Sequence, residues 1–226
     1  MLYSMRQFDD LTYVHSVNVA LIASILGQWL KFSEKDIRIL TISGLLHDIG
    51  KIMIPNEILT KPGKLTVAEY NIMKQHVNFG YEKVKNQNID IRIKEACLLH
   101  HEKCDGTGYP FGLKSDHIPA VAKIIAIADV YDAMTSARVY RGALCPFEVI
   151  DTMYKDAFTK FEPEYILPFL KNVASSYINN DVRLSDGRIG KVVLINENAL
   201  SLPIVQCEDE FIDLSKTRGL TVSAIL

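Results

Sequence analysis

The sequence predicts a mainly α-helical domain followed by a small β-rich subdomain. Over residues 9–177, apolar side chains recur at roughly helical spacing between capping residues and turn signals. At about Asn179 the pattern changes to short apolar runs, and Asp186-Gly187 fits the tight turn of a β-hairpin. We therefore expect a helical domain at residues 1–178 and a β-rich subdomain at residues 179–226.

Length and composition bound the class of protein. The chain has 226 residues, of which 48% are hydrophobic and 23% charged, as in an ordinary globular domain with a small appendage. A formal net charge of −2 argues against binding of long nucleic acid. The four cysteines include no C-x-x-C pair, which indicates a reducing compartment and no zinc ribbon. The start lacks a signal-peptide pattern and apolar runs such as residues 19–27 are too short to span a bilayer, so we expect a cytoplasmic protein without membrane insertion.

Capping residues mark the first two helices. Asp9 or Asp10 can cap a helix that runs to about Leu30. Ser33, followed by three charged residues, is a second helix start, and that helix runs into His47.

A connecting loop and a third helix follow. Residues 52–65 contain two prolines and a glycine, which are typical of a loop. Thr66 and Glu69 form a capping-box pattern, so a third helix begins there. It carries His76, and Gly80 predicts a break after that histidine.

The rest of the chain divides in the same way. Glycines and a proline exclude regular structure between residues 102 and 113. The expected helices are 91–101, 120–134, 146–158 and 164–177, and the expected strands are 182–185, 189–195, 203–206 and 211–214.

Several histidines and aspartates lie beside apolar helical segments. One buried histidine is usually structural, and a single His-Asp pair is a weak signal. A buried carboxylate without a partner is costly, however, so it calls for a cation. Imidazoles and carboxylates together suit a metal site. The residues concerned are His47, Asp48, His76, His100, His101 and Asp129.

Other polar residues flank these donors. His15 lies near the start of the first helix, where we expect it to be partly exposed. The loop after the double histidine carries Glu102, Asp105 and Tyr109, and we expect it to be tied to the site because loops on rigid scaffolds often carry function. Beyond residue 136, Arg138 and Arg141 are candidates for phosphate binding through their guanidinium groups.

The motifs together resemble a known family. They are His47-Asp48-Ile49-Gly50-Lys51, then His76, His100-His101-Glu102, Asp105-Gly106-Thr107-Gly108-Tyr109-Pro110, and Asp129-Val130-Tyr131-Asp132-Ala133. In this order and spacing, over residues 15–163, the chain resembles the HD-GYP family, a branch of the HD-domain metal phosphohydrolases. The resemblance implies an HD-domain helical bundle that binds two or three metal ions, most often iron or manganese. It also implies hydrolysis of the bacterial messenger cyclic di-GMP to linear di-guanylate, GMP or both.

The resemblance also assigns roles to individual residues. The implied metal ligands are His47, Asp48, His76, His100, His101 and Asp129. Lys51 is the implied partner of the substrate phosphate or leaving group, and Tyr109, Arg138 and Arg141 are implied substrate contacts. Glu102 and Asp105 are expected to orient ligands or the loop.

Two metal ions would explain the donor set. Such ions can share a bridging hydroxide and clamp a phosphate for in-line attack. Asp48 is the residue best placed to bridge both ions, which would give it a catalytic role beside Lys51.

The chain departs from the family pattern at two places. Members with three ions carry a glutamate four residues before the first histidine, where this chain has Leu11, so we expect two ions and a supporting role for His15. The family's His-Phe-Asp-Pro stretch is Lys160-Phe161-Glu162-Pro163 here, which should affect packing around the site and puts substrate affinity in question.

Three alternatives stay open. The protein could be a cyclic di-GMP receptor with little turnover, an HD phosphohydrolase for another nucleotide, or a helical scaffold. The scaffold would leave Asp48 and Asp129 without partners, which argues against it. Protein partners or dimerisation could involve the Gly-Tyr-Pro loop or the β-rich subdomain.

Overall fold

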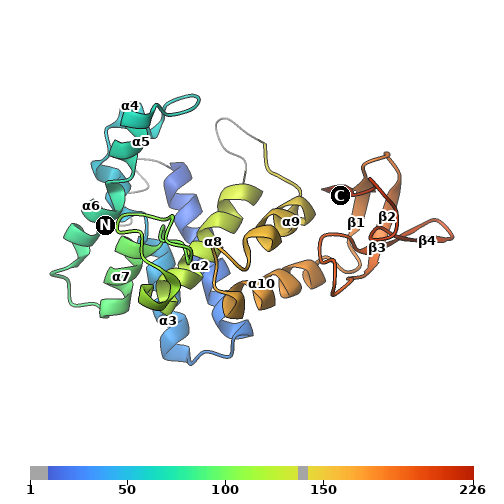
Figure 1. Cartoon of the computed structure of the whole chain (residues 1–226), viewed down its shortest axis with the longest axis horizontal. Helices are drawn as coiled ribbons and strands as arrows, with labels where there is room; N and C mark the ends of the chain where they lie inside the picture. Colours follow the sequence, from blue (N-terminus) through green and yellow to red (C-terminus); the bar gives the residue numbers. More distant parts are fainter. Residues whose placement is uncertain (1–9, 137–141) are drawn as a thin grey trace.

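Helices form one end of the protein and an antiparallel sheet forms the other (Figure 1). The structure is a computed structural model that describes residues 10–136 and 142–226. The helices are α2 (Asp10–Trp29), α3 (Glu34–Leu46), η1 (Ile49–Met53), α4 (Asn56–Leu59), α5 (Val67–Met73), α6 (His76–Val84), α7 (Ile91–Leu99), η2 (Ser115–His117), α8 (Ala120–Thr135), α9 (Pro146–Asp156) and α10 (Pro163–Ser176). The strands are β1 (Asp181–Leu184), β2 (Ile189–Leu194), β3 (Ile204–Cys207), β4 (Glu210–Asp213) and β5 (Val222–Ile225). This confirms a mainly α fold with a small C-terminal sheet.

The helix starts follow the predicted caps. The Ser33 hydroxyl accepts a hydrogen bond from the third residue of the helix that follows it, α3. Thr66 and Glu69 form both hydrogen bonds of the capping box before α5. Asp90 caps α7 by accepting from the Arg92 amide.

The region around His76 differs from the prediction in two ways. Residues 52–65 are not all loop, because they contain α4. The helix break lies before His76 rather than after it, and Gly80 continues α6. The reason is a close crossing, since a Cβ atom on Gly50 of η1 would overlap the His76 carbonyl oxygen and the Gly80 nitrogen. The glycines thus serve contact between two backbones.

The long helix α2 is central to the bundle. It contacts α3, α8 and α10, and its residues Val19, Ala23 and Leu26 are fully buried. By length and composition alone, residues 11–29 could cross a membrane, contrary to the expectation that the apolar runs are too short to do so. The buried face of α2 fits the core helix of a folded domain, and a core helix passes the same test.

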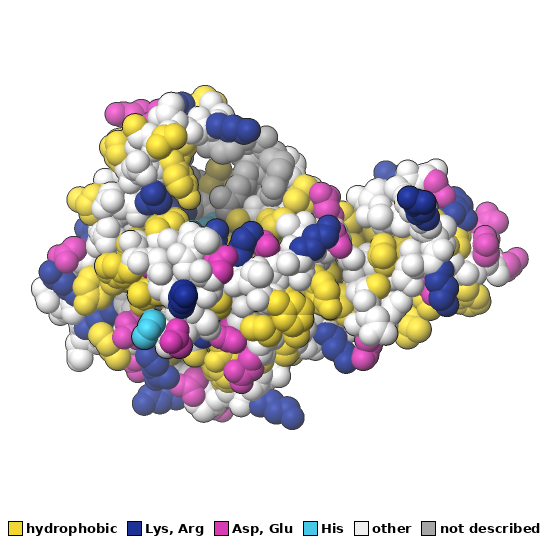
Figure 2. Space-filling view, viewed as in Figure 1, with side chains coloured by type: hydrophobic (Ala, Val, Ile, Leu, Met, Phe, Trp, Pro, Cys, Tyr) yellow, Lys and Arg dark blue, Asp and Glu magenta, His cyan; other side chains and the backbone are white. Residues whose placement is uncertain are grey.

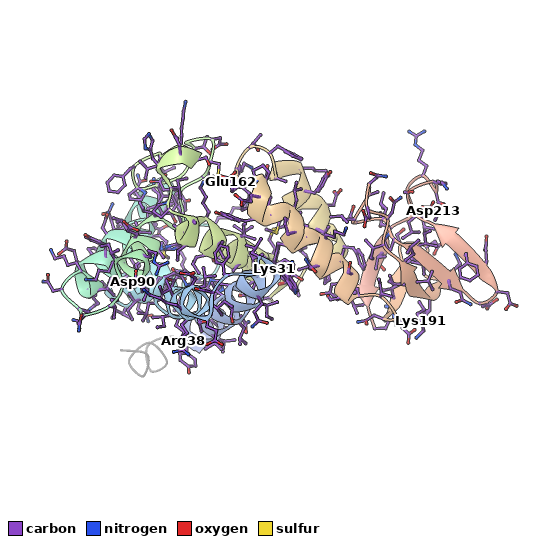
Figure 3. The ribbon with its side chains drawn as sticks, turned by 90° about the horizontal axis from the view of Figure 1, so that it is seen from below. Lys31, Arg38, Asp90, Glu162, Lys191 and Asp213 are labelled. Carbon is purple, nitrogen blue, oxygen red and sulfur yellow. The ribbon has the colours of Figure 1, made fainter. Side chains whose placement is uncertain are left out.

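The C-terminal residues form the sheet, which lies at the end of the molecule opposite α7 (Figure 1). Its strand order is β4-β3-β2-β1-β5, and all pairs are antiparallel. The predicted hairpin turn is present, with Gly187 at φ 94°, whereas β5 was not predicted. Viewed at right angles, Lys191 and Asp213 mark the sheet end, and Asp90 marks the far end (Figure 3).

The helices and the sheet share one apolar core. Val182 and Val192 of the sheet belong to the same buried cluster as Phe147 of α9 and Phe169 of α10. α9 also contacts β5 directly. The division at residues 178 and 179 therefore falls within a continuous core, and it stays a proposal about domain organisation.

Candidate metal centre

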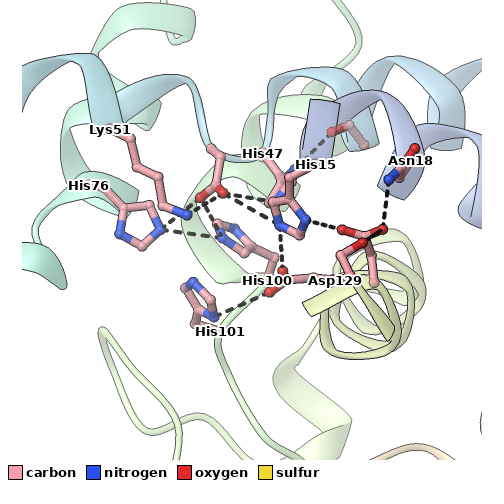
Figure 4. A network of polar contacts seen from close by, with 12 residues as sticks. His15, Asn18, His47, Lys51, His76, His100, His101 and Asp129 are labelled. Carbon is pink, nitrogen blue, oxygen red and sulfur yellow. Dashed lines mark hydrogen bonds and ion pairs between the residues drawn. The ribbon is translucent and has the colours of Figure 1, made fainter. Parts of the chain in front are cut away.

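Four histidines surround Asp48. They are His15, His47, His76 and His100, which Figure 4 labels. α3 ends just before Asp48, which leaves the helical conformation at φ −97° and ψ 9°. Its Oδ2 lies 3.3 Å from His47 Nε2 and 3.8 Å from His15 Nε2. Its Oδ1 lies 3.3 Å from His76 Nε2 and 3.8 Å from His100 Nε2. Each carboxylate oxygen thus faces a different pair of imidazoles.

Three of these imidazoles present a lone pair toward Asp48. Their Nδ1 atoms lie 2.7–2.9 Å from backbone carbonyl oxygens: His47 with Gly44, His76 with Met73, and His100 with Ala96. A carbonyl only accepts, so Nδ1 carries a proton, and in a neutral imidazole ring the lone pair then lies on Nε2. Nitrogen lone pairs and carboxylate oxygens repel one another unless a cation lies between them.

Two buried atoms in this cluster lack a hydrogen-bond partner among the described residues. They are His47 Nε2 and Asp48 Oδ1. Buried polar atoms are nearly always hydrogen-bonded, and a bound ion is one accepted explanation for an exception. The donor set fits divalent metal ions, for which nitrogen and oxygen ligands are usual.

The donors form two groups. One consists of Asp48, His76, His100 and His101, and the other of His15, His47 and Asp129. Within each group the ligand atoms lie within 4.8 Å of one another. His101 Nδ1 also lies 3.8 Å from an Asp129 oxygen, which brings the groups together. All six predicted metal ligands therefore meet at one place.

The charge states of these groups suit metal binding. Burial lowers the pKa of His76, and it lowers the pKa of His100 well below the usual value. Burial alone would raise the pKa of Asp48, but Lys51 and the histidines outweigh it and hold this pKa well below the usual range. Near neutral pH, His76 and His100 are therefore neutral imidazoles beside an ionised carboxylate, the forms that bind cations.

His15 differs from its prediction. It is buried, at 9% exposure, rather than partly exposed. Its Nε2 lies 2.9 Å from Asp129 Oδ1 and its Nδ1 lies 2.5 Å from Asp132 Oδ2. Burial would lower the pKa of His15, but these two hydrogen bonds outweigh it and raise the pKa to about 9. His15 therefore lies among the metal-ligand candidates and not merely beside them, while Leu11, one turn earlier, offers no donor.

Two supporting residues were not identified from the sequence. Asn18 Nδ2 and Ser136 Oγ each donate a 2.9 Å hydrogen bond to Asp132 Oδ1, and Asp132 in turn bonds to His15. Asn18 lies three residues after His15, so the helical spacing was an available signal. These contacts fix the His15 ring through Asp132.

Lys51 reaches the same carboxylate from η1. Its Nζ lies 2.5 Å from Asp48 Oδ2, and its side chain is partly exposed. The ammonium group is therefore held beside the donor cluster and remains accessible to a ligand.

The Gly-Tyr-Pro loop is fastened to the cluster by Glu102. This buried carboxylate accepts hydrogen bonds from the backbone amides of Phe111 and Leu113, at 2.7 and 2.9 Å. The Tyr109 amide donates to the His101 carbonyl, and the Tyr109 ring stacks on the His101 ring at a centroid distance of 4.7 Å. Burial raises the pKa of Tyr109, so its hydroxyl is neutral.

We predict that Glu102→Gln loosens this loop. In glutamine, an NH₂ group replaces one of the two carboxylate oxygens. This NH₂ group is a donor and would face a backbone N–H, which is also a donor, so one of the two buried hydrogen bonds would be lost. We expect the free energy of unfolding in urea to fall by about 1.5–3 kcal/mol. Glu57→Gln, at an exposed position, should change it by less than about 0.5 kcal/mol. Equal effects of the two substitutions would contradict this role.

Asp105 and Glu162 order the loop from outside the cluster. Asp105 is exposed and accepts hydrogen bonds from the Thr107 amide and hydroxyl, so it orients the loop and not the ligands. Glu162, at the departure from the family pattern, accepts from Lys123 Nζ at 2.6 Å and from Ser115 Oγ at 2.5 Å. The packing around the site therefore includes an ion pair between Glu162 and Lys123.

Two predicted site residues cannot be placed. Arg138 and Arg141 lie outside the described residues. The other predicted site residues all lie in or next to the cluster or its loop. On the face seen in Figure 2, the surface is hollowed beside α4 and α5.

Comparisons with known proteins agree with this geometry. The profile of the HD domain family matches residues 6–165. The cyclic di-GMP phosphodiesterase PA4108 of Pseudomonas aeruginosa is 36% identical over 206 residues, which cover 91% of this chain and 50% of that protein. The 3′3′-cGAMP-specific phosphodiesterase 1 of Vibrio cholerae is 40% identical over 148 residues, which cover 64% of this chain and 34% of that protein. The chain thus spans half or less of the length of these relatives.

A solved structure supports the fold. Bd1817, an HDG"Y"P protein from Bdellovibrio bacteriovorus, superimposes with a TM-score of 0.58 at 23% identity. The match covers 69% of this chain and 50% of that one. HD domains imply divalent metal binding, and the His/Asp cluster supplies the donors. The chain therefore belongs to the HD domain family, in its HD-GYP branch.

Proposed function

We propose that this protein is a metal-dependent phosphodiesterase that hydrolyses cyclic di-GMP to linear di-guanylate, GMP or both. The observation that carries this proposal is the position of Asp48, which offers one oxygen to each of two donor groups. The Gly-Tyr-Pro loop beside the cluster and the names of the relatives support cyclic di-GMP as the substrate.

The donor residues divide between two ions in this proposal. Asp48, His76, His100 and His101 would hold one ion, and His15, His47 and Asp129 the other, with Asp48 shared. When bound, divalent ions supply an activated water molecule and neutralise phosphate charge. Nitrogen and oxygen donors without thiolate suit iron or manganese, which we propose as the metals. Leu11 argues against a third ion.

The remaining site residues would handle the substrate. Lys51 would carry its proton beside the scissile phosphate and donate it to the leaving ribose oxygen, because its ammonium group is held next to Asp48 and is partly exposed. Tyr109 would line the substrate side of His101. Arg138 and Arg141 are proposed phosphate contacts on the family pattern.

We propose the helical region, residues 1–178, as the catalytic unit, and residues 179–226 as a packing or partner surface. Both donor groups found among the described residues lie in the first region, and the sheet extends away from them. The chain's four cysteines are free, which favours a cytoplasmic location.

The test is hydrolysis by metal-loaded protein. Protein loaded with Fe(II) or Mn(II) without oxygen is incubated with cyclic di-GMP or 3′3′-cGAMP, and the products are separated by chromatography. We expect linear di-guanylate or GMP from cyclic di-GMP, loss of activity after chelation, and loss of metal from His76→Ala. His117→Ala, at an exposed histidine outside the cluster, serves as the matched control.

Each alternative has its own outcome in this experiment. Metal-loaded protein that binds cyclic di-GMP without forming product would be a receptor. Product from 3′3′-cGAMP alone would assign another cyclic dinucleotide. If the protein bound no stoichiometric metal, the helical scaffold would be the only alternative that remains.

A further inference from the structure

Helix α5 has no role in the core. None of its residues is buried, and Val67, Tyr70 and Ile72 are 80%, 48% and 41% exposed. The capping box and a 2.6 Å ion pair between Lys61 and Glu69 nonetheless hold its start in place. Most helices in proteins are stabilised by packing of an apolar face, so a helix without a buried face calls for another explanation. It borders the hollow seen in Figure 2.

The residue after α5 links this helix to the metal centre. Lys74 Nζ lies 5.3 Å from the centre of the Tyr70 ring and 6.0 Å from the centre of the Tyr109 ring. Tyr109 in turn stacks on His101, a metal-ligand candidate. The Lys74 ammonium is thus separated from the donor cluster by a single aromatic ring.

Lys74 also differs from the other lysines near the site. Lys51 is paired with Asp48, and Lys61 is paired with Glu69. Within the described parts of the chain, Lys74 has no carboxylate within ion-pair distance, and its ammonium group lies over the Tyr70 and Tyr109 rings. An ammonium group held over aromatic faces keeps its charge available for an anionic ligand.

We infer that Tyr70 and Lys74 form a nucleotide subsite of the active site, in which the Tyr70 ring stacks on a purine base and Lys74 contacts a phosphate. The inference rests on the proposed function. A cyclic dinucleotide carries two phosphodiesters, and only one can lie at the metal centre in a given step. The second phosphodiester remains anionic and needs a cation nearby. Lys74 can supply this cation, because its ammonium group lies over the Tyr109 ring, which stacks on His101. A base stacks on any exposed aromatic face, and Tyr70 is half exposed.

The test compares four variants with the unmodified, metal-loaded protein. Lys74→Met removes the charge and Lys74→Arg keeps it, while Tyr70→Leu removes the ring and Tyr70→Phe keeps it. We expect Lys74→Met and Tyr70→Leu each to raise the KM for cyclic di-GMP about tenfold, with kcat within about twofold, because stacking and charge contacts of this kind are of that size. Lys74→Arg and Tyr70→Phe should stay within about threefold of the unmodified protein.

Salt dependence and a matched control separate this role from a structural one. The KM of Lys74→Met should rise less steeply with salt than that of the unmodified protein, because one phosphate contact is gone. Lys83→Met, at an exposed lysine of α6, should change neither KM nor metal content. An unchanged KM in Lys74→Met, or an equal change in Lys83→Met, would overturn the inference while leaving the proposed function intact.

Binding of an analogue tests the subsite separately from the proposed phosphodiesterase activity if the protein shows no turnover. The bis-phosphorothioate analogue of cyclic di-GMP, which resists hydrolysis, is titrated into the same proteins. If the unmodified protein binds the analogue but hydrolyses no cyclic di-GMP, the phosphodiesterase proposal fails, and about tenfold weaker binding by Lys74→Met and Tyr70→Leu would still support the subsite. Equal binding by these variants, or no binding by any protein, would overturn the subsite.

Discussion

Asp48→Asn is expected to remove most of the bound metal and to lower hydrolysis of cyclic di-GMP by at least about 100-fold, since losing even an outer partner of a metal ligand costs 10–100-fold. The substitution keeps the shape of the side chain but removes its negative charge. Both donor groups lose their shared ligand at once, because Oδ1 faces one pair of histidines and Oδ2 the other. Metal content by mass spectrometry and initial rates check the result.

The fold should survive this change. An amide at position 48 can donate a hydrogen bond to an Nε2 atom that now has no partner, such as that of His47. Asp116→Asn is the matched control, because the Asp116 carboxylate is exposed and lies beside His117, outside the cluster. Normal metal content and activity in Asp48→Asn would refute the central role of this carboxylate.

Gly50→Ala is expected to destabilise the protein strongly. The new Cβ would overlap the backbone of α6 at His76 and Gly80, and a backbone cannot move aside as a flexible side chain can. We expect a loss of about 3 kcal/mol or more in the free energy of unfolding, which corresponds to a fall in Tm of roughly 6–12 °C for a chain of this size.

The same substitution should also disturb the metal centre. Displacing α6 moves His76, so metal affinity should fall together with stability. Gly142→Ala is the control, because a Cβ there meets no atom within 4 Å. Thermal unfolding and metal titration of both variants provide the measurement, and an unchanged Tm for Gly50→Ala would show that η1 and α6 do not cross as closely as described.

Local signals in the sequence determined most of the secondary structure. Ser33, Thr66 with Glu69, and Asp90 act through hydrogen bonds to amides two or three residues away, so their effects can be read without the fold. The Asp186-Gly187 turn is local in the same sense. The donor residues themselves were evident from their types and their resemblance to the HD-GYP pattern.

Contacts between distant segments decided the remainder. Gly80 was expected to break a helix, but its role is set by Gly50, thirty residues earlier, whose backbone lies against it. β5 is a short strand whose partner, β1, lies about forty residues away. Neither effect is visible in a local window of sequence.

His15 shows the same division at the metal centre. Its sequence position determined that it lies on the first helix, but its burial and its hydrogen bonds depend on α8, which supplies Asp129 and Asp132 more than one hundred residues later. The sequence by itself thus determined which groups could bind metal and which helices carry them. Only the tertiary structure decided that His15 lies in the cluster, that Asp48 offers one oxygen to each donor group, and that Lys74 lies between two tyrosines. These arrangements depend on packing between helices, whereas propensities and caps act within a single helix.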